Sequence, residues 1–172
     1  MTSIEEMGAR IDDLERRVDA TESVLALHQL KARYAELVDS RFVRGGLVDA
    51  ERLGEVAGAA AELFTEDGIW DGGPGLGVAR GREEIAARLA EPTLVFSRHL
   101  FVKPRIVVDG DRASARWDLL CPCTRPDGQS MWMCGYEDDT YIRVEGVWLH
   151  ATMSLSTAFI SPAGEGWPRI LA

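Results

Sequence analysis

Asp39 and His99 are the side chains of this sequence best suited to moving a proton near neutral pH. Histidine changes its charge in that range, and a carboxylate bonded to one ring nitrogen fixes the tautomer and raises the basicity of the ring. Asp39 could supply that carboxylate. The residues alone also allow Asp39 to be a solvated aspartate near a helix end and His99 to be a histidine bonded to backbone at a sheet edge. The functional reading of the pair is general acid–base chemistry.

Tyr34 lies five residues before Asp39, which places the two about 140° apart around a helix. They cannot share one narrow stripe, yet a carboxylate near the helix end can turn into a cavity that the tyrosine also lines. A core aromatic on the apolar stripe of the helix is the alternative for Tyr34.

A polar row follows one side of a predicted strand, where every second residue is Glu137, Asp139, Tyr141 and Arg143. Solvent is the usual explanation for such a face. On the concave side of a curved sheet the same residues would line a pocket, where Arg143 could stabilise developing negative charge. Tyr141 and Arg143 are therefore candidate substrate-binding residues.

Motifs for other chemistries are missing from the sequence. It contains no GxSxG, P-loop, correctly flanked GxGxxG or metal-ligand cluster, and its three cysteines lack CxxC spacing. We expect no metal and no cofactor, which leaves acid–base chemistry on a small-molecule substrate.

The net charge of −9 argues against nucleic acid as a partner, because phosphate binding needs clustered Lys and Arg. No apolar run reaches membrane-spanning length, and the charged N-terminus does not resemble a secretory signal. We expect a cytoplasmic protein without a membrane partner.

Apolar residues near the N-terminus recur in alternating steps of three and four, as in a heptad repeat: Ile4, Met7, Ile11, Leu14, Val18, Thr21 and Leu25. A helix of this length is marginal alone, so the stripe needs a partner. A sister subunit is favoured over packing on the same domain. Residues 1–25 are predicted to be a helical extension, 26–165 the domain and 166–172 a tail.

The remaining pattern is helices first and strands afterwards. A second helix continues from Leu27 through Leu37 and Val38 and stops near the glycine pair at 45–46. A further helical stretch covers residues 49–64 and ends near Gly68, and a short helix follows a glycine-rich loop at 72–81. Residues 98–123 and 129–162 then read as two hairpins with turns at 109–111 and 144–146. This order predicts an α+β domain with helices packed on one face of a curved antiparallel sheet.

Several stretches together resemble the SnoaL-like branch of the nuclear transport factor 2-like (NTF2-like) superfamily: LHQLKARYAELVDSRF, AAELFTEDGIWDGG, GREEIAARL, SRHLFVKPRIVVDGDRASARW and GYEDDTYIRVEGVWLHATMSL. The likeness covers about residues 26–165. Within that branch, the sequence is similar to scytalone dehydratase, bile acid 7α-dehydratase and hexachlorocyclohexane dehydrochlorinase. The resemblance implies a cone-shaped α+β barrel, elimination without a cofactor, and a homo-oligomer, trimer or dimer.

The resemblance also implies roles. Asp39 and His99 fall on the catalytic pair of the branch, Tyr34 on a tyrosine of the bile acid dehydratase, and Arg143 on a pocket arginine of the dehydrochlorinase. Trp70 and Trp117 become candidate pocket walls, with a core role as the alternative. We therefore expect a dehydratase-like lyase or isomerase acting on a small, largely apolar ring compound. A non-catalytic ligand-binding module, a dioxygenase-type small subunit and a polyketide cyclase are the alternatives.

Overall fold

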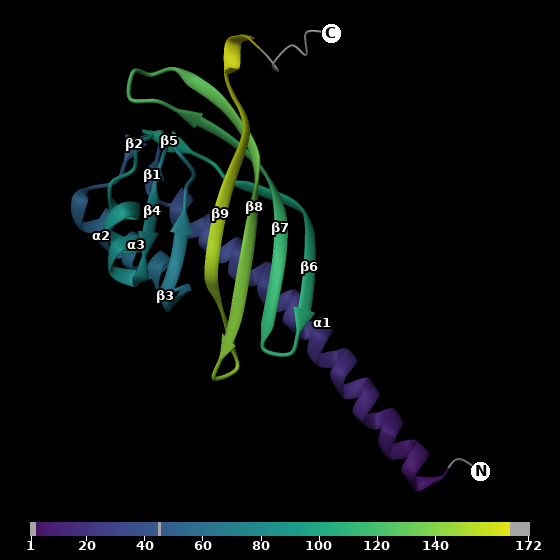
Figure 1. Ribbon diagram of the computed structural model, residues 1–172. Coiled ribbons are helices and arrows are strands. Elements are labelled where there is room, and N and C mark those ends of the chain that lie inside the picture. The colour runs from purple at the N-terminus through teal and green to yellow at the C-terminus, as the bar shows by residue number, and fades with distance from the viewer. Residues whose placement is uncertain (1–2, 45, 166–172) are drawn as a thin grey trace.

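Helix α1 (Ile4–Asp39) is continuous from the predicted extension into the domain. It begins at a capping box, because the Ser3 hydroxyl accepts the Glu6 N–H while the Glu6 carboxylate accepts the Ser3 N–H. The computed structural model describes residues 3–44 and 46–165, so the predicted tail at 166–172 lies outside the described residues. Figure 1 shows the N-terminal half of α1 projecting beyond the sheet while its C-terminal half crosses the sheet.

The other elements follow in the expected order of helices and then strands. They are β1 (Phe42–Val43), β2 (Gly46–Leu47), α2 (Ala50–Ala61), β3 (Phe64–Asp71), β4 (Val78–Arg80), α3 (Gly81–Ala90), β5 (Phe96–Ser97), β6 (Leu100–Asp109), β7 (Arg112–Thr124), β8 (Ser130–Val144), β9 (Val147–Pro162) and a 3₁₀ turn (Ala163–Glu165). The α+β class is confirmed, as are the two long hairpins β6–β7 and β8–β9.

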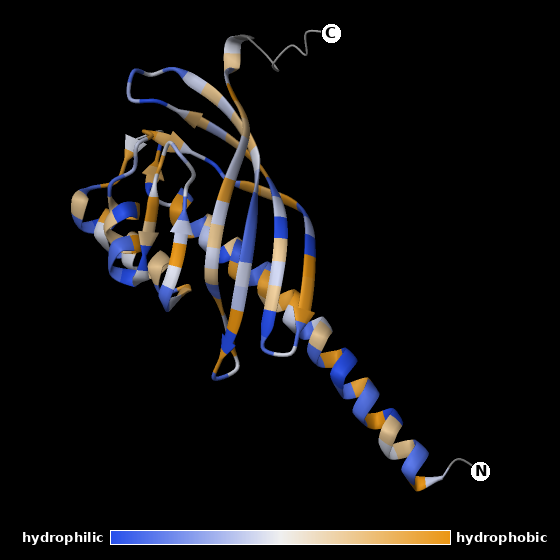
Figure 2. Ribbon diagram, viewed as in Figure 1, coloured by the Kyte–Doolittle hydropathy of each residue, from blue (hydrophilic) through white to orange (hydrophobic). Residues whose placement is uncertain are grey.

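The main sheet is curved and open. Its strands run in the order β4, β3, β9, β8, β7, β5, with β6 also paired to β7, and only the β3–β9 pair is parallel. Every second residue of β7 from Ala113 to Cys123 is buried, whereas the residues between them are exposed or half-buried, the pattern of a strand with one covered face. Figure 2 shows this alternation of hydropathy along the long strands.

The helix predicted over residues 49–64 ends earlier than expected. Helix α2 stops at Ala61, and Gly68 lies inside strand β3 instead of ending a helix. Phe64 is completely buried there, and the pairing of β3 with β9 shifts register between Phe64 and Ile69. A Cβ on Gly68 would lie 2.9 Å from Cβ of Phe64, so glycine fits this irregular part of the strand.

The apolar core has three parts, two of which include the buried face of α1. One part joins the C-terminal half of α1 to α2, α3 and β3. The other places Leu27 of α1 on strands β7, β8 and β9, against Trp117, Tyr141 and Trp148. This packing fixes the C-terminal end of α1 over the sheet. Within the described residues, no helix is long and apolar enough to cross a membrane.

Candidate active site

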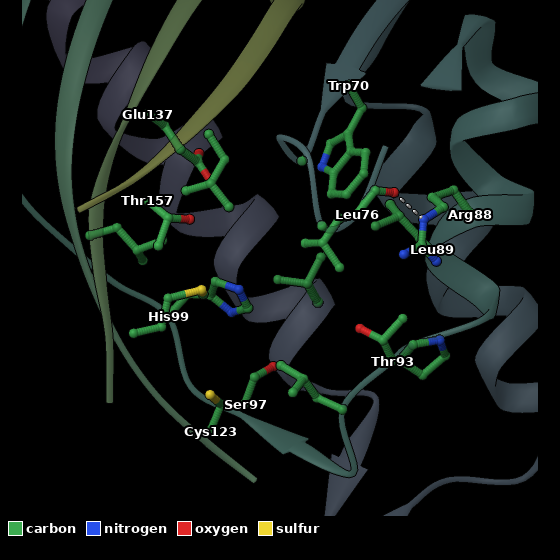
Figure 3. Close-up of a pocket in the computed structure, with 18 of the residues that line it drawn as sticks. Trp70, Leu76, Arg88, Leu89, Thr93, Ser97, His99, Cys123, Glu137 and Thr157 are labelled. Carbon is green, nitrogen blue, oxygen red and sulfur yellow. Dashed lines mark hydrogen bonds between the residues drawn. The ribbon is translucent and has the colours of Figure 1, made fainter. Parts of the chain in front are cut away.

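A cavity of about 830 Å³ lies between the helices and the concave face of the sheet. This volume is within the range of small-molecule sites. Figure 3 shows side chains from α3, β3 and the long strands converging on it. Eleven of the lining residues have aliphatic, methionine or phenylalanine side chains: Val38, Phe42, Leu76, Leu89, Leu94, Leu119, Met131, Met133, Met153, Leu155 and Ile160.

The structure brings Asp39 together with His99, and of the two only His99 lines this cavity. Asp39 is the last residue of α1, and His99 lies between β5 and β6. The Nδ1 atom of His99 is 2.7 Å from Oδ1 of Asp39, and the backbone N–H of His99 donates to both carboxylate oxygens at 3.1 Å. The Asp39 carboxylate thereby takes up Nδ1 and leaves Nε2 as the ring nitrogen available to a ligand. Figure 3 shows His99 among the side chains that line the cavity.

Tyr34 and Trp70 form a second polar group in the cavity. The indole Nε1–H of Trp70 donates to the Tyr34 hydroxyl oxygen at 2.9 Å. Both residues line the cavity, and Tyr34 is only 4% exposed. Burial raises the pKa of the Tyr34 phenol well above its ordinary value. Tyr34 therefore stays protonated at neutral pH and can donate a hydrogen bond to a ligand.

A buried ion cluster adjoins the cavity. The Lys31 ammonium contacts the carboxylates of Glu137 and, at 2.8 Å, Asp139. Glu137 lines the cavity, whereas Asp139 lies deeper and accepts the Tyr141 hydroxyl at 2.7 Å. Burial opposes the charge on Lys31, but the two carboxylates outweigh it and raise the pKa of Lys31. Burial also raises the pKa of Asp139 to about 6, although Lys31 acts in the other direction.

Lys31 was missed by the sequence interpretation, although its spacing carries a signal. It lies four residues after Leu27 and three before Tyr34, so it belongs to the buried face of α1. A lysine on such a face needs a buried partner, because an unpaired ammonium is costly away from water. The polar row on β8 supplies that partner through Glu137 and Asp139.

Three of the predicted substrate-binding residues lie outside the cavity lining. Arg143 is held at the far end of β8 by Asp19 and Asp111, each at 2.7 Å. Tyr141 and Trp117 are buried beneath α1, where the Trp117 indole donates to the Tyr141 hydroxyl at 2.9 Å. The structure thus groups Asp39, His99, Tyr34 and Trp70 and separates the other three from them.

Within residues 3–44 and 46–165, no group of three or more His, Cys, Asp or Glu side chains is arranged to hold a metal ion. The cationic side chains around the cavity are Arg41, Arg88 and Arg125. Arg41 and Arg88 donate to backbone carbonyls, among them those of Leu89 and Leu76. Their guanidinium groups are therefore already engaged by the protein.

Comparison with known proteins gives a family and a shared fold. The model of the SnoaL-like domain matches residues 19–154. No curated protein matches the sequence. Hexachlorocyclohexane dehydrochlorinase LinA-type3 from Novosphingobium barchaimii has a similar structure, with a TM-score of 0.70, 20% identity, and coverage of 91% of this chain and 99% of that one.

Two further structures are similar. A protein of Novosphingobium aromaticivorans, provisionally described as a scytalone dehydratase, is 19% identical, with a TM-score of 0.67 and coverage of 83% of this chain and 88% of that one. A protein of unknown function from Mycobacterium tuberculosis is 26% identical, with a TM-score of 0.63 and coverage of 78% and 76%. Dehydratase and dehydrochlorinase structures are thus among the neighbours of this fold.

Proposed function

We propose that this chain, which belongs to the SnoaL-like domain family, is a lyase or isomerase that uses His99 as its base and requires no cofactor. The observation that carries the proposal is the 2.7 Å contact between His99 Nδ1 and the Asp39 carboxylate at the wall of the 830 Å³ cavity. The similarity to dehydratase and dehydrochlorinase structures supports elimination as the class of reaction.

In this proposal, Nε2 of His99 takes a proton from a carbon next to an activating group. The electrons of the broken C–H bond form a double bond as the leaving group departs from the neighbouring carbon. The imidazolium that forms faces the Asp39 carboxylate, which stabilises its positive charge. For a hydroxyl leaving group, the same imidazolium returns the proton and water is lost. For a halide, the proton stays on His99 until it reaches solvent.

Tyr34 supplies the hydrogen bond that stabilises negative charge on the substrate. Its oxygen is occupied by the Trp70 N–H, so its own hydrogen is free to point at a carbonyl or an enolate oxygen in the cavity. A donor held in place before the reaction is more effective than water, which must reorient as the charge develops. Tyr34 thus acts as a donor, and His99 alone acts as the base.

The lining favours a neutral, largely apolar substrate. Apolar side chains form much of the wall, and Arg41 and Arg88, two of the three arginines that line it, are engaged with backbone carbonyls. The carboxylate of Glu137 lies in the same wall, where it disfavours a second negative charge nearby. We infer that the substrate is a small ring compound that bears a carbonyl or halide, and not a polyanion.

The test is a panel of cyclic β-hydroxy ketones and cyclic halides, with enone absorbance and halide release as the readouts. We expect turnover by the wild type and a loss of about 10²- to 10⁴-fold in His99→Gln. Asp39→Asn should also lose activity. Glu36→Gln is the matched control, because it removes the same charge from an exposed position on α1. Ligand binding that is equal in the wild type and His99→Gln, without turnover in either, would instead support a binding module.

A further inference from the structure

Helix α1 carries two apolar faces that point in opposite directions. Its C-terminal half buries Leu27, Tyr34 and Val38 against the domain. Its N-terminal half carries a second row, here called the exposed seam: Ile4, Met7, Ile11, Leu14 and Val18. Nine residues separate Val18 from Leu27, which turns the helix by about 180°. The domain that covers Leu27 therefore cannot cover the exposed seam.

The exposed seam is open to solvent in the single chain. Its five side chains are between 46% and 86% exposed. Figure 2 shows hydrophobic residues recurring along the part of α1 that projects from the domain. Large apolar side chains in one contiguous row mark an interaction surface more often than isolated ones do. The capping box at Ser3 starts the helix at the first residue of the seam, so the whole row is presented on regular helix.

The residue types of the exposed seam fit a helix pair. With Ile4 at heptad position a, the a positions are Ile4, Ile11 and Val18, and the d positions are Met7 and Leu14. β-Branched residues at a with leucine-like residues at d favour parallel, two-stranded coiled coils. An occupant with the same pattern is present in every solution of this protein, namely a second copy of the chain.

The flanking charges fix the orientation of that second copy. Position g holds Arg10 and Arg17, and position e holds Glu15 and Glu22. In a parallel, in-register pair, each g residue faces the e residue five positions later on the other helix, so each arginine meets a glutamate. An antiparallel pair would set arginine against arginine and glutamate against glutamate. Within the described residues, Arg10, Glu15 and Glu22 form no ion pair in the single chain, so they are available.

We propose that two copies of this chain dimerise through a parallel, in-register coiled coil formed by the exposed seam. The apolar contacts end at Val18, and the last charge pair joins Arg17 to Glu22 of the other copy. Beyond it the helix belongs to the domain, because Asp19 is bound by Arg143 and Ser23 is buried. This inference does not depend on the proposed function, because none of the seam residues lines the cavity.

The first test measures the mass of the full chain by sedimentation and light scattering. The wild type should have twice the mass of the 18.9 kDa chain, and Ile11→Asp with Leu14→Asp should have the monomer mass. Ala9→Asp with Arg16→Gln is the matched control, because it makes the same change in net charge at f positions, away from the seam. A wild-type monomer, or an oligomer whose mass the seam variant leaves unchanged, would overturn the proposal.

The second test examines the charges and the orientation. Arg10→Glu with Arg17→Glu, and Glu15→Arg with Glu22→Arg, should each weaken the dimer alone and form a dimer when mixed. Met7→Cys should form a disulfide-linked dimer on oxidation, with the wild type treated identically as the control, because only a parallel pair brings the two Met7 positions together. Circular dichroism should show that every variant is folded. With folded variants, either of two results would contradict the parallel arrangement: charge variants that dimerise like the wild type, or no cross-link in Met7→Cys.

Discussion

The carboxylate of Asp39 binds both the ring and the backbone of His99, with Oδ1 2.7 Å from Nδ1 and 3.1 Å from the backbone nitrogen. The side chain of Asp39 is only 4% exposed, so little water competes for these bonds. The imidazole is therefore oriented before any ligand enters, with its second nitrogen left for the cavity. This arrangement is the basis of the proposed proton transfer.

Tyr34→Phe should reduce both stability and turnover. The variant leaves the buried Trp70 N–H without its acceptor, which costs about 1 to 3 kcal/mol. It also removes the donor to the substrate, so we expect kcat to fall by about 10- to 100-fold. Tyr141→Phe is the control, because Tyr141 accepts the Trp117 N–H in the same way but lies outside the cavity lining. It should lose stability and keep its kcat; equal losses of kcat in both would argue against a role for Tyr34.

Lys31→Met should destabilise the fold by about 3 to 5 kcal/mol, because it leaves Glu137 and Asp139 as buried charges without a cation. Urea unfolding at pH 7 measures this loss. Lys103→Met removes a lysine from an exposed ion pair with Asp118 and should cost less than about 1 kcal/mol. Adding Glu137→Gln and Asp139→Asn to Lys31→Met should recover part of the stability, and no recovery would mean that lost packing dominates.

His150 should make the protein less stable in acid. It is completely buried near Asp139 and Lys31 and packs on Tyr34, Phe64 and Tyr141. Burial, with help from Lys31, lowers its pKa well below 6.5. Below pH 6.5 the unfolded chain therefore binds a proton that the folded chain does not, and stability is lost as the pH falls.

Replacing that histidine should remove the effect. Between pH 6.5 and 5, His150→Phe should lose up to about 2 kcal/mol less stability than the wild type. Asp139 works in the opposite sense, because its pKa is raised to about 6 and its contribution to stability is lost as the pH rises through that value. Denaturant unfolding at several pH values measures both slopes. Parallel curves for the two proteins would show that His150 does not titrate on unfolding.

Arg143→Gln should leave kcat and KM unchanged, because Arg143 binds Asp19 and Asp111 at the end of the sheet and does not line the cavity. The change should instead loosen the projecting part of α1, which hydrogen exchange of the amides around Asp19 would detect. A rise in KM without a change in hydrogen exchange would indicate that Arg143 does contact the substrate.

Local sequence pattern predicted the strands well. Period-two alternation identified the β6–β7 and β8–β9 hairpins, and it placed Glu137, Asp139 and Tyr141 on the same face of β8. Alternation gives the face of a strand but does not say what covers each part of its length. Along β8, the cavity adjoins Glu137, whereas α1 covers Tyr141. The sequence predicted substrate-binding roles for Tyr141 and Arg143 because it could not show which part of β8 the cavity adjoins.

The contact between Asp39 and His99 joins residues 60 positions apart, and no local periodicity encodes it. The family resemblance suggested the pair, and the packing of α1 across the sheet determines its geometry. The early end of α2 had a different cause. The small-residue stretch before Phe64 fits a helical pattern, so the sequence predicted that the helix would continue. In the structure Phe64 and Thr65 are buried in β3, and the helix ends at Ala61.

The orientation of His99 can be measured directly by nitrogen NMR of its ring, with the signals assigned by comparison with His99→Gln. At a pH where the ring is neutral, we expect the proton on Nδ1, facing Asp39, and an unprotonated Nε2 that is available as a base. Addition of a cyclic ketone should perturb the Nε2 signal more than the Nδ1 signal. A proton on Nε2, with Nδ1 bare beside the carboxylate, would contradict the account.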